Sequence, residues 1–467
     1  MKKNLSTKIL LLVIGTITFC FVGLRWNIPI IIWIWPISFL LFLRNEKSSL
    51  NSLIPIPLLI ISSYMSIQGG MEMSFWLHLG ISIVRPLPFL AALYTDKLLL
   101  RKINPIMHLF IYPGTYVIID YIFTLIPFLG SSFSLATGLF DNKSIIQLSS
   151  FTGIWGISFI VSLFSTMLLF VWGNWEKIKI VYIPVIIYSS FLFLVLFFGG
   201  LRYSVHVPKE RTVKVGSITI ERNGITEGEI KKRLFESSQD AVDLGAKIVF
   251  WSEWNLIVKA NEVDNFKASA KDFANANRIY FSPSIVIDFP NIHSENIVYL
   301  FNPEGELLFE YYKTKSWLPT SSDGIIKAAE TPYGTLSIVI CFDLDFPTFI
   351  NKQLRKKNVD ILLVPANDWK PIAPFHSQVG MIRGIENGFS IVRQTYEGLS
   401  FASDFHGRVL NYQNYFNTEV KVMLTDVPIK GVKTIYSTFG DWFIYIIIFF
   451  MLSSLIVTII KRNKEKV

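Results

Sequence analysis

Three side chains at the ends of apolar segments could together carry out nucleophilic chemistry on a carbonyl carbon. Cys341 follows "TLSIVI", Glu253 follows "AKIVFWS", and Lys313 ends the hairpin-like stretch "NIVYLFNPEGELLFEYYK". A cysteine attacks as its thiolate and therefore needs a neighbour that accepts its proton. Glu253 could be that base. Lys313, with a backbone N–H near the cysteine, could stabilise the oxyanion that forms during the attack.

The six histidines leave a second arrangement open, because His376 or His406 could accept the thiol proton instead. Each of the three residues also has an ordinary explanation when taken alone. A buried cysteine often packs as a small apolar side chain, and a single glutamate or lysine is usually on the surface. The cysteines and histidines lack the spacing of a metal-ligand set, and we find no glycine-rich phosphate loop. We therefore expect no metal and no cofactor.

Residues 205–435 must position these side chains, and they have the pattern of a layered α/β domain. Alternating or β-branched stretches predict strands at 212–221, 246–254, 278–287, 335–342 and 360–368, a hairpin at 296–313 with "NPEG" as its turn, and the strands "FSIVRQTY" and "LSFASDFHGRVL". Helical spacing predicts helices at 226–244, 263–277, 347–357 and 376–388. The hairpins indicate a mixed sheet. Ligands in layered folds gather beyond strand ends, where the three candidate residues stand.

The rest of the chain is too apolar for an ordinary soluble protein. Hydrophobic residues make up 51% of the 467 positions, and they concentrate in residues 9–200 and 441–460. A helix needs about 20 apolar residues to cross a bilayer. Eight spans are predicted on this basis, at 8–25, 28–43, 52–68, 75–95, 108–128, 151–172, 180–200 and 440–460. The first could be a signal peptide, but no small-residue cleavage site is evident, so we interpret it as a retained span.

Basic residues gather in "MKKNLSTK", "RNEKSS", "DKLLLRK", "NWEKIK" and "KRNKEKV", which eight spans would place on one side of the membrane. The positive-inside rule assigns that side to the cytoplasm. The formal charge of +9 therefore reflects orientation in the membrane rather than nucleic-acid binding. We expect a seven-span domain at 1–204, a domain on the outer face at 205–435, and a last span with a cytoplasmic tail at 436–467.

The order of these motifs resembles a known superfamily. A strand followed by glutamate, a hairpin ending in "YxK", and a strand followed by cysteine and an acid are similar to the nitrilases, or carbon–nitrogen hydrolases. The whole chain resembles the bacterial apolipoprotein N-acyltransferases, which carry eight spans and a nitrilase-like domain before the last. The segments that match are "FWSEWN", "EYYKTK", "VICFDLDFP", "PANDWK", "GLFDNKSIIQLSSFTGIWGISFIV" and "HSQVGMIRGIENGFSIVRQTYEGLSFASDFHGRVL".

The resemblance implies a polytopic α-helical membrane protein with an inserted α-β-β-α sandwich, and it assigns roles to individual residues. The implied catalytic residues are Glu253, Lys313 and Cys341. Asp343, Phe342 and Asp323 would support the oxyanion and the catalytic residues, and Trp317, Asn367 and Trp369 would bind substrate. The chain departs from the family where "KTKSWLPTSSDG" has no glutamate, so that Asp323 is the nearest acid, and where Phe342–Asp343 replaces the family's "YE".

The function that the resemblance implies is a two-step acyl transfer at the outer face of the bacterial cytoplasmic membrane. An acyl chain would pass from a phospholipid to Cys341 and then to the N-terminal amine of a diacylglyceryl-cysteine apolipoprotein. The expected partners are a phospholipid donor, a diacylated apolipoprotein and membrane lipids. Two alternatives stay open at this point: a membrane-tethered amidase that uses water in the second step, and an inactive scaffold or lipid-binding module.

Overall fold

The computed structural model describes residues 5–70, 73–204, 211–289, 294–316, 319–418 and 421–464, without the side chains of 459 and 461–464. These residues form two compact units, each discontinuous in sequence. One, here called the helical unit, comprises residues up to Leu125, Ser131–Leu201 and the chain from Asp441 onward. The other, here called the α/β unit, comprises Ile126–Gly130 and Arg202–Gly440.

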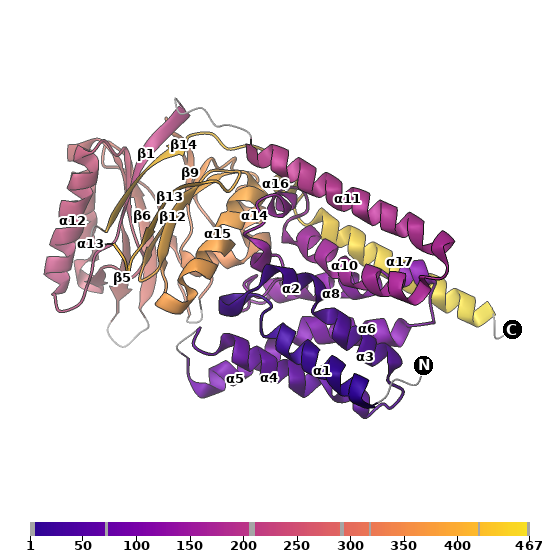
Figure 1. The fold of residues 1–467 in the computed structure, drawn as a ribbon. Helices are drawn as coiled ribbons and strands as arrows, with labels where there is room; N and C mark the ends of the chain where they lie inside the picture. The colour runs from indigo at the N-terminus through magenta and orange to yellow at the C-terminus, as the bar shows by residue number, and fades with distance from the viewer. Residues whose placement is uncertain are drawn as a thin grey trace. The chain divides into compact units, whose positions relative to one another are not determined.

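The helical unit contains a helix or a pair of helices at each of the eight predicted apolar segments (Figure 1). Prolines interrupt two segments, because a proline lacks the N–H that continues a helix: Pro36 begins the second helix of one pair, and Pro86 separates the helices of another. The helices are α1 (Leu5–Phe19), α2 (Pro29–Ile34), α3 (Pro36–Asn45), α4 (Pro55–Ile67), α5 (Phe75–Val84), α6 (Leu87–Leu99), α7 (Pro105–His108), α8 (Ile111–Leu125), α9 (Ser149–Thr152), α10 (Ile154–Asn174), α11 (Ile178–Ser204) and α17 (Trp442–Lys464).

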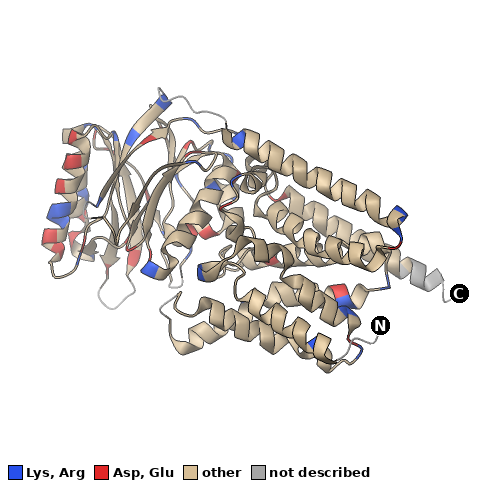
Figure 2. Cartoon of the chain, in the orientation of Figure 1, with Lys and Arg blue, Asp and Glu red and all other residues tan. Residues whose placement is uncertain are grey.

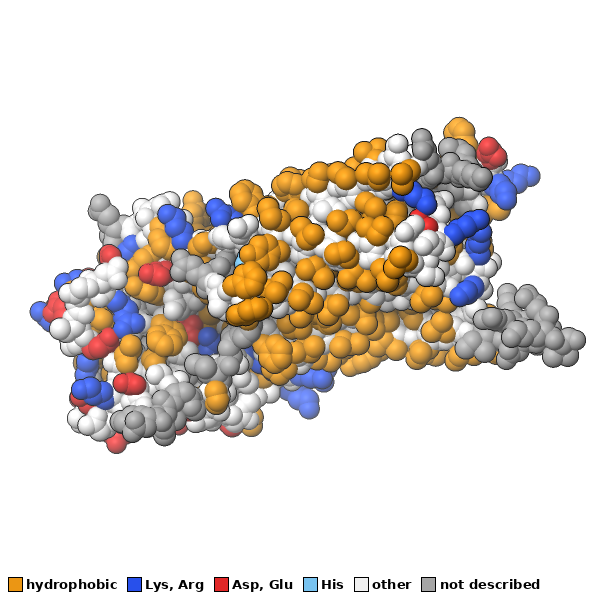
Figure 3. Space-filling model, turned by 90° about the horizontal axis from the view of Figure 1, so that it is seen from below, with side chains coloured by type: hydrophobic (Ala, Val, Ile, Leu, Met, Phe, Trp, Pro, Cys, Tyr) orange, Lys and Arg blue, Asp and Glu red, His pale blue; other side chains and the backbone are white. Residues whose placement is uncertain are grey.

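Four helical segments of the described chain are long and apolar enough to cross a membrane: Phe75–Leu99, Pro105–Leu125, Ile154–Asn174 and Ile178–Ser204. The other four apolar helices are shorter. Large apolar side chains face outward from this unit, as the space-filling view of one face shows (Figure 3). On α11 and α17, for example, Phe193 is 64% exposed and Phe449 is 73% exposed.

Three of the predicted basic segments meet within the helical unit. Lys8 Nζ lies 2.7 Å from Glu46 Oε2, and Arg44 forms a two-bonded pair with Asp96 at 2.7 and 2.8 Å. Lys97 Nζ donates to the Glu46 carbonyl at 3.2 Å. Figure 2 shows few other charges along these helices. The first turn of α1 and the C-terminal ends of α3 and α6 therefore lie at the same end of the unit.

The α/β unit contains two β-sheets. The eight-stranded sheet has the order β14-β1-β2-β4-β6-β5-β3, with β7 paired to β6, and the six-stranded sheet has the order β13-β12-β11-β10-β9-β8. Both sheets mix parallel and antiparallel pairs. The strands are β1 (Thr212–Ile218), β2 (Ile248–Trp251), β3 (Ile257–Lys259), β4 (Tyr280–Ser282), β5 (Ser284–Asp288), β6 (Glu295–Phe301), β7 (Leu307–Tyr312), β8 (Ala328–Thr331), β9 (Gly334–Ile338), β10 (Ile361–Asn367), β11 (Ser390–Tyr396), β12 (Leu399–Ser403), β13 (Val409–Asn414) and β14 (Val422–Pro428).

Helices cover the outer face of each sheet, so that the unit is an α-β-β-α sandwich, as predicted (Figure 1). α12 (Glu227–Asp243) and α13 (Val263–Asn277) pack on the eight-stranded sheet, while α14 (Pro347–Leu354) and α15 (Ala373–Asn387) lie on the six-stranded side. Apolar faces of α12 and α13 form a core with the sheet around the fully buried Trp251. Between the sheets, Ser217 Oγ donates to Gln394 Oε1 at 2.6 Å.

Several strands of this unit differ from the sequence prediction. The single predicted strand at 278–287 is two strands, β4 and β5, and the short strands β3 and β8 were not predicted. The single predicted strand "LSFASDFHGRVL" is two strands, β12 and β13, because Asp404 Oδ1 accepts hydrogen bonds from the N–H groups of His406 and Arg408 and forms a turn. The last strand, β14, was not predicted. It pairs with β1, from Thr212 opposite Pro428 to Ile218 opposite Val422, and so joins the two ends of the domain.

Candidate active site

Cys341 lies in a sharp turn immediately beyond a strand. β9 ends at Ile338, and a single 3-10 helix, η7, runs over Cys341–Asp345. Cys341 has φ +47°, which is left-handed backbone that costs a residue with a Cβ about 1–3 kcal/mol. The side chain is buried, and its thiol contacts the carbonyl oxygen of Asn367 at 3.6 Å. The turn therefore takes the sulfur out of the strand and holds it beside the end of β10.

Glu253 and Lys313, which are 60 residues apart in sequence, are in direct contact. Lys313 Nζ donates to Glu253 Oε1 at 2.8 Å, and Asn296 Nδ2 donates to the same oxygen at 2.9 Å. The glutamate side chain is only 1% exposed and that of the lysine 15% exposed. Both hydrogen bonds fall on Oε1, which leaves Oε2 without a partner among the described residues.

Cys341 lies within the electrostatic influence of this pair. Burial, followed by the negative charge of Glu253, raises the pKa of the Cys341 thiol above its ordinary value, and the Lys313 ammonium acts against that rise. Burial alone would lower the pKa of Lys313, but Glu253 and Cys341 raise it above its ordinary value. The resting site therefore holds a neutral thiol and a charged ammonium, so the sulfur needs a base before it can react.

Asp343 ties the cysteine turn to the segment that carries Lys313. Its Oδ1 accepts from the N–H groups of Thr314 and Lys315 at 3.1 and 2.5 Å, and its Oδ2 accepts from the Tyr311 hydroxyl at 2.8 Å and the Ile340 N–H at 3.1 Å. Burial raises the pKa of Asp343 to about 6, against these hydrogen bonds. Since four donors point at its oxygens, the carboxylate has no hydrogen bond to give to an oxyanion. It instead holds the Cys341 turn and the segment after Lys313 together.

The other predicted residues are spread over the site and its surroundings. Phe342 follows Cys341 and packs edge-on against Phe346, with ring centroids 5.1 Å apart. Trp369, 37% exposed, follows β10. Asp323 is not brought to Lys313: its exposed carboxylate forms an ion pair with Lys327 at 2.5 Å and caps the Ile325 N–H. Trp317 lies outside the described residues.

Four buried charged residues lie close to Cys341, and of these the sequence analysis named only His376, as a possible base. Asp345, Asp368, His376 and Arg393, here called the buried ion-pair network, are each at most 7% exposed. A signal was present in the sequence, because a charge such as Arg393 within the apolar stretch "FSIVRQTY" is costly to bury without a partner. Asn296, which donates a hydrogen bond to Glu253, lies near the start of β6, and nothing in the surrounding sequence indicates this role.

His376 also answers the question of a Cys–His pair. Its Nδ1 lies 2.7 Å from Asp368 Oδ1, and its Nε2 lies 3.0 Å from Asp345 Oδ1. Arg393 Nη2 also lies 3.0 Å from Nδ1. Both ring nitrogens are therefore occupied by charged partners, and neither offers a free lone pair to a thiol proton. His406, the other candidate, lies in the Asp404 turn between β12 and β13, where burial and Arg202 lower its pKa to about 4.

One ligand atom each of Cys341, Asp368 and His376 lies within 4.8 Å of the other two, as in a metal site. The donor atoms are already engaged, however. Arg393 donates to both oxygens of Asp368, at 2.7 and 2.8 Å, and the histidine nitrogens donate to carboxylates. A metal would have to displace a buried guanidinium and a histidine proton, so these residues fit an ion-pair network better than a metal centre.

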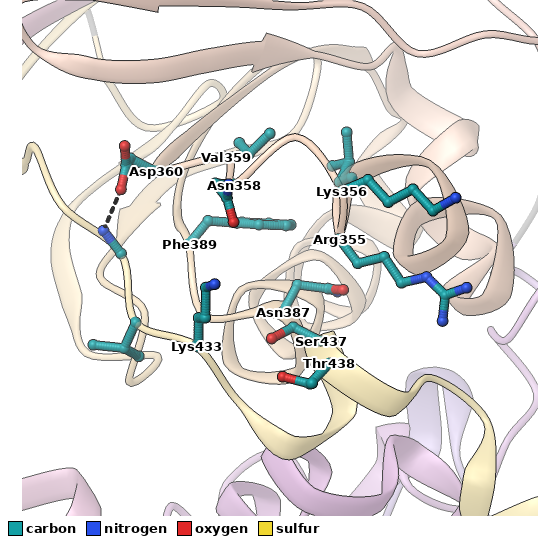
Figure 4. A pocket seen from close by; sticks show the side chains of 13 residues that line it. Arg355, Lys356, Asn358, Val359, Asp360, Asn387, Phe389, Lys433, Ser437 and Thr438 are labelled. Atoms are coloured by element: carbon teal, nitrogen blue, oxygen red, sulfur yellow. Dashed lines mark hydrogen bonds between the residues drawn. The ribbon is translucent and has the colours of Figure 1, made fainter.

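A separate cavity of about 690 Å³ lies at the N-terminal ends of strands β10 and β11 of the six-stranded sheet (Figure 4). Asp360 and Phe389 line it, and they precede β10 and β11, whereas Cys341 adjoins the far end of β10. The carboxylate of Asp360 accepts from the N–H groups of Thr335 and Gly431. Arg355 and Lys356 extend away from Lys433 (Figure 4), so these cations do not converge, and we assign no reaction to the cavity.

Comparison with known proteins finds a family model, named relatives and solved structures that are similar to this chain. The carbon–nitrogen hydrolase family model matches residues 225–435. The apolipoprotein N-acyltransferase 2 of Treponema denticola is 24% identical over 362 residues, covering 65% of this chain and 68% of that protein. The apolipoprotein N-acyltransferase of Rickettsia bellii is 25% identical, covering 71% of each chain. Among solved structures, an amidase from Nesterenkonia sp. has 16% identity and a TM-score of 0.43, covering 49% of this chain and 94% of that one.

The α/β unit is therefore a carbon–nitrogen hydrolase domain with a nitrilase-like fold, as the sequence predicted. The similarity to named relatives extends well beyond this domain into the apolar helices. The chain is a homologue of the apolipoprotein N-acyltransferases within the nitrilase superfamily, and the resemblance is confirmed.

Proposed function

We propose that the protein is an N-acyltransferase that moves an acyl chain from a phospholipid, through a thioester on Cys341, to the N-terminal amine of diacylglyceryl-cysteine apolipoproteins. The observation that carries this proposal is the length of the similarity. It spans 362 residues in one relative and so includes apolar helices outside the hydrolase domain. An amidase acting on a soluble substrate has no need of these helices, and it is not favoured.

In the first step, Glu253 Oε2 accepts the thiol proton while Cys341 Sγ attacks the ester carbonyl carbon of the phospholipid. The negative charge moves to the carbonyl oxygen. Lys313, kept charged by Glu253, and a backbone N–H near Cys341 stabilise this oxyanion. The C–O bond then breaks, the lysophospholipid leaves as an alcohol with the proton from Glu253, and the acyl chain stays on sulfur as a thioester.

In the second step, the amine of the apolipoprotein attacks the thioester carbonyl carbon. Glu253 accepts a proton from the nitrogen, and the same donors stabilise the second oxyanion. The C–S bond breaks, and the thiolate takes the proton back from Glu253, which restores the resting thiol and releases an amide. Water must be excluded during the lifetime of the thioester, because its attack would turn the enzyme into a lipase.

The helical unit would hold the catalytic domain at the bilayer, where both substrates are anchored. Extracting a lipid chain into water costs about 0.8 kcal/mol per CH₂, which a membrane-tethered enzyme avoids. The long apolar helices and their exposed apolar side chains support a multi-pass arrangement. The contacts of Lys8, Arg44 and Lys97 at one end support a cytoplasmic side for the basic loops. Residues 205–435 would then face outside the bacterial cytoplasmic membrane, with 1–204 and 436–467 as the membrane domains.

The proposal predicts a covalent intermediate that can be weighed directly. The full chain is incubated in lipid nanodiscs with a phospholipid of one defined acyl chain, and the peptide that carries Cys341 is analysed by mass spectrometry. We expect the mass of that acyl chain on Cys341, and its loss when a diacylated lipopeptide is added. Cys20, the other cysteine, is an internal control.

An unmodified Cys341 in protein that is folded would refute the acyl-transfer mechanism. The scaffold alternative is tested by Cys341→Ala and Cys341→Ser in cells that depend on this protein. If lipoprotein N-termini stay fully acylated in both variants, the cysteine has no catalytic role.

A further inference from the structure

The buried ion-pair network connects four different elements beside the nucleophile. Asp345 belongs to η7, Asp368 follows β10, His376 lies on α15, and Arg393 lies on β11. Both carboxylates contact the histidine ring, at 3.0 and 2.7 Å, and Arg393 grips Asp368 with two hydrogen bonds. Burying four charges costs several kcal/mol per ion before pairing, and well-packed apolar residues often replace such clusters without loss of stability. The network is therefore a candidate for a role in function.

The geometry fixes the charge of this network. Both ring nitrogens of His376 face carboxylate oxygens, and Arg393 Nη2 lies 3.0 Å from Nδ1. The shortest contact of each nitrogen is to a carboxylate, which accepts only, so we assign both nitrogens as donors and the ring as an imidazolium. The carboxylates raise the pKa of His376 to about 9 although its burial acts to lower it, which agrees with this assignment. Two carboxylates, one imidazolium and one guanidinium then sum to zero net charge.

The network reaches the sulfur in two ways. A nitrogen of His376, an oxygen of Asp368 and Cys341 Sγ all lie within 4.8 Å of one another. The carbonyl of Asn367, which accepts from the thiol, also belongs to the residue before Asp368, so a fixed Asp368 fixes that carbonyl. The charged groups around the sulfur are Glu253 and Lys313 on one side, Asp343 and Asp345 in its own turn, and Asp368, His376 and Arg393 on the neighbouring elements.

We propose that Asp345, His376 and Arg393 are positioning residues that hold the acceptor of the Cys341 thiol in place and keep the electric potential at its sulfur balanced. Because its net charge is zero, the network adds little to the potential at the sulfur, and burial with Glu253 keeps the thiol protonated until a substrate is present and Glu253 takes its proton. This inference rests on the proposed role of Cys341 as nucleophile. It assigns no proton transfer to His376, because its nitrogens have no free lone pair.

Removing one charge of either sign must shift the ionisation of the thiol in opposite directions. Asp345→Asn leaves the network with a net positive charge, since Asp368 still holds the imidazolium, and a positive charge stabilises the thiolate. His376→Gln leaves a net negative charge, which disfavours the thiolate. At a fixed pH below the midpoint, we expect alkylation of Cys341 to become about 10-fold faster in Asp345→Asn and about 10-fold slower in His376→Gln, which corresponds to about one pKa unit each.

The test measures the rate at which iodoacetamide modifies Cys341 of the full chain in nanodiscs as a function of pH, by mass spectrometry of the peptide. Glu386→Gln is the matched control. It removes a buried carboxylate that pairs with Arg383 at 2.5 Å on the same helix, about 15 Å along α15 from His376. We expect the midpoint pH to fall in Asp345→Asn, rise in His376→Gln and stay constant in Glu386→Gln.

A merely structural network would lower the thermal unfolding midpoint of these variants without moving the alkylation midpoint, and that result would overturn the proposal. So would an equal shift in Glu386→Gln. If one of the two network variants does not fold, the direction in which the alkylation midpoint of the other variant shifts decides between the two explanations. Alkylation needs no acyl donor, so a missing thioester in the wild-type protein would refute the proposed function without affecting this measurement.

Discussion

A substitution of Asp343 should affect the acylation rate more strongly than the stability of this domain, so the two effects can be measured separately. The carboxylate accepts four hydrogen bonds, and three of them come from backbone N–H groups on the two segments that carry Cys341 and Lys313. An Asp343→Asn variant keeps the shape of the side chain but presents an NH₂ group to one of the two pairs of donors.

The orientation of the new amide sets the size of the loss. If its NH₂ faced Thr314 and Lys315, two buried N–H groups would lose their acceptor. If it faced Tyr311 and Ile340, the tyrosine hydroxyl could turn and accept, and only one N–H would be orphaned. The second orientation is preferred, and it costs about 1–3 kcal/mol. For a domain of this size, the unfolding midpoint should fall by roughly 2–12 °C.

Catalysis should suffer more than stability, because Asp343 fixes the backbone directly after Lys313. A displacement of about 1 Å in a catalytic group can cost on the order of 100-fold in rate. We expect Asp343→Asn to slow acylation of Cys341 by about 10- to 100-fold. The assay is single-turnover acylation of the full chain in nanodiscs, alongside thermal unfolding.

Asp360→Asn is the control for this experiment. Asp360 also accepts hydrogen bonds from two backbone N–H groups, of Thr335 in β9 and of Gly431 after β14, but at the end of the strands that lies away from Cys341. It should lose similar stability and keep its acylation rate. An Asp343→Asn protein with a lowered unfolding midpoint and an unchanged acylation rate would refute our account of Asp343 as the support of Lys313.

Two further predictions concern the Glu253–Lys313 pair. Glu253→Gln should slow acylation by about 100- to 10,000-fold, the usual range for losing a general base, while phospholipid still binds; equal acylation rates at all pH values would exclude Glu253 as the base. Lys313→Met leaves the buried Glu253 without its cation, which should cost about 3–5 kcal/mol in the free energy of unfolding. Because the pKa of folded Lys313 lies above its ordinary value, its stabilising effect is present through neutral pH and is lost only as the pH rises through the folded value. A wild-type unfolding midpoint that falls between pH 6 and 8 to that of Lys313→Met would contradict this.

Local features of the sequence determined much of this protein. Apolar runs predicted all eight helical segments of the helical unit, because the period and length of such runs are set by the chain itself. Alternating strands and helices predicted the layered domain, and Cys341, Glu253 and Lys313 were selected because each ends a strand pattern. The contact of Glu253 with Lys313 agrees with that selection.

Only the tertiary structure decided which polar groups meet. The β1–β14 pair joins segments about 200 residues apart, and no local pattern specifies such a pairing. The left-handed backbone of Cys341, the grip of Asn296 on Glu253, and the network of Asp345, Asp368, His376 and Arg393 depend on four or more elements packed together. A charged residue within an apolar stretch of sequence indicates that a partner is needed, but the sequence does not identify that partner. The fold determines it, because the energy of an ion pair depends on distance and burial rather than on separation along the chain.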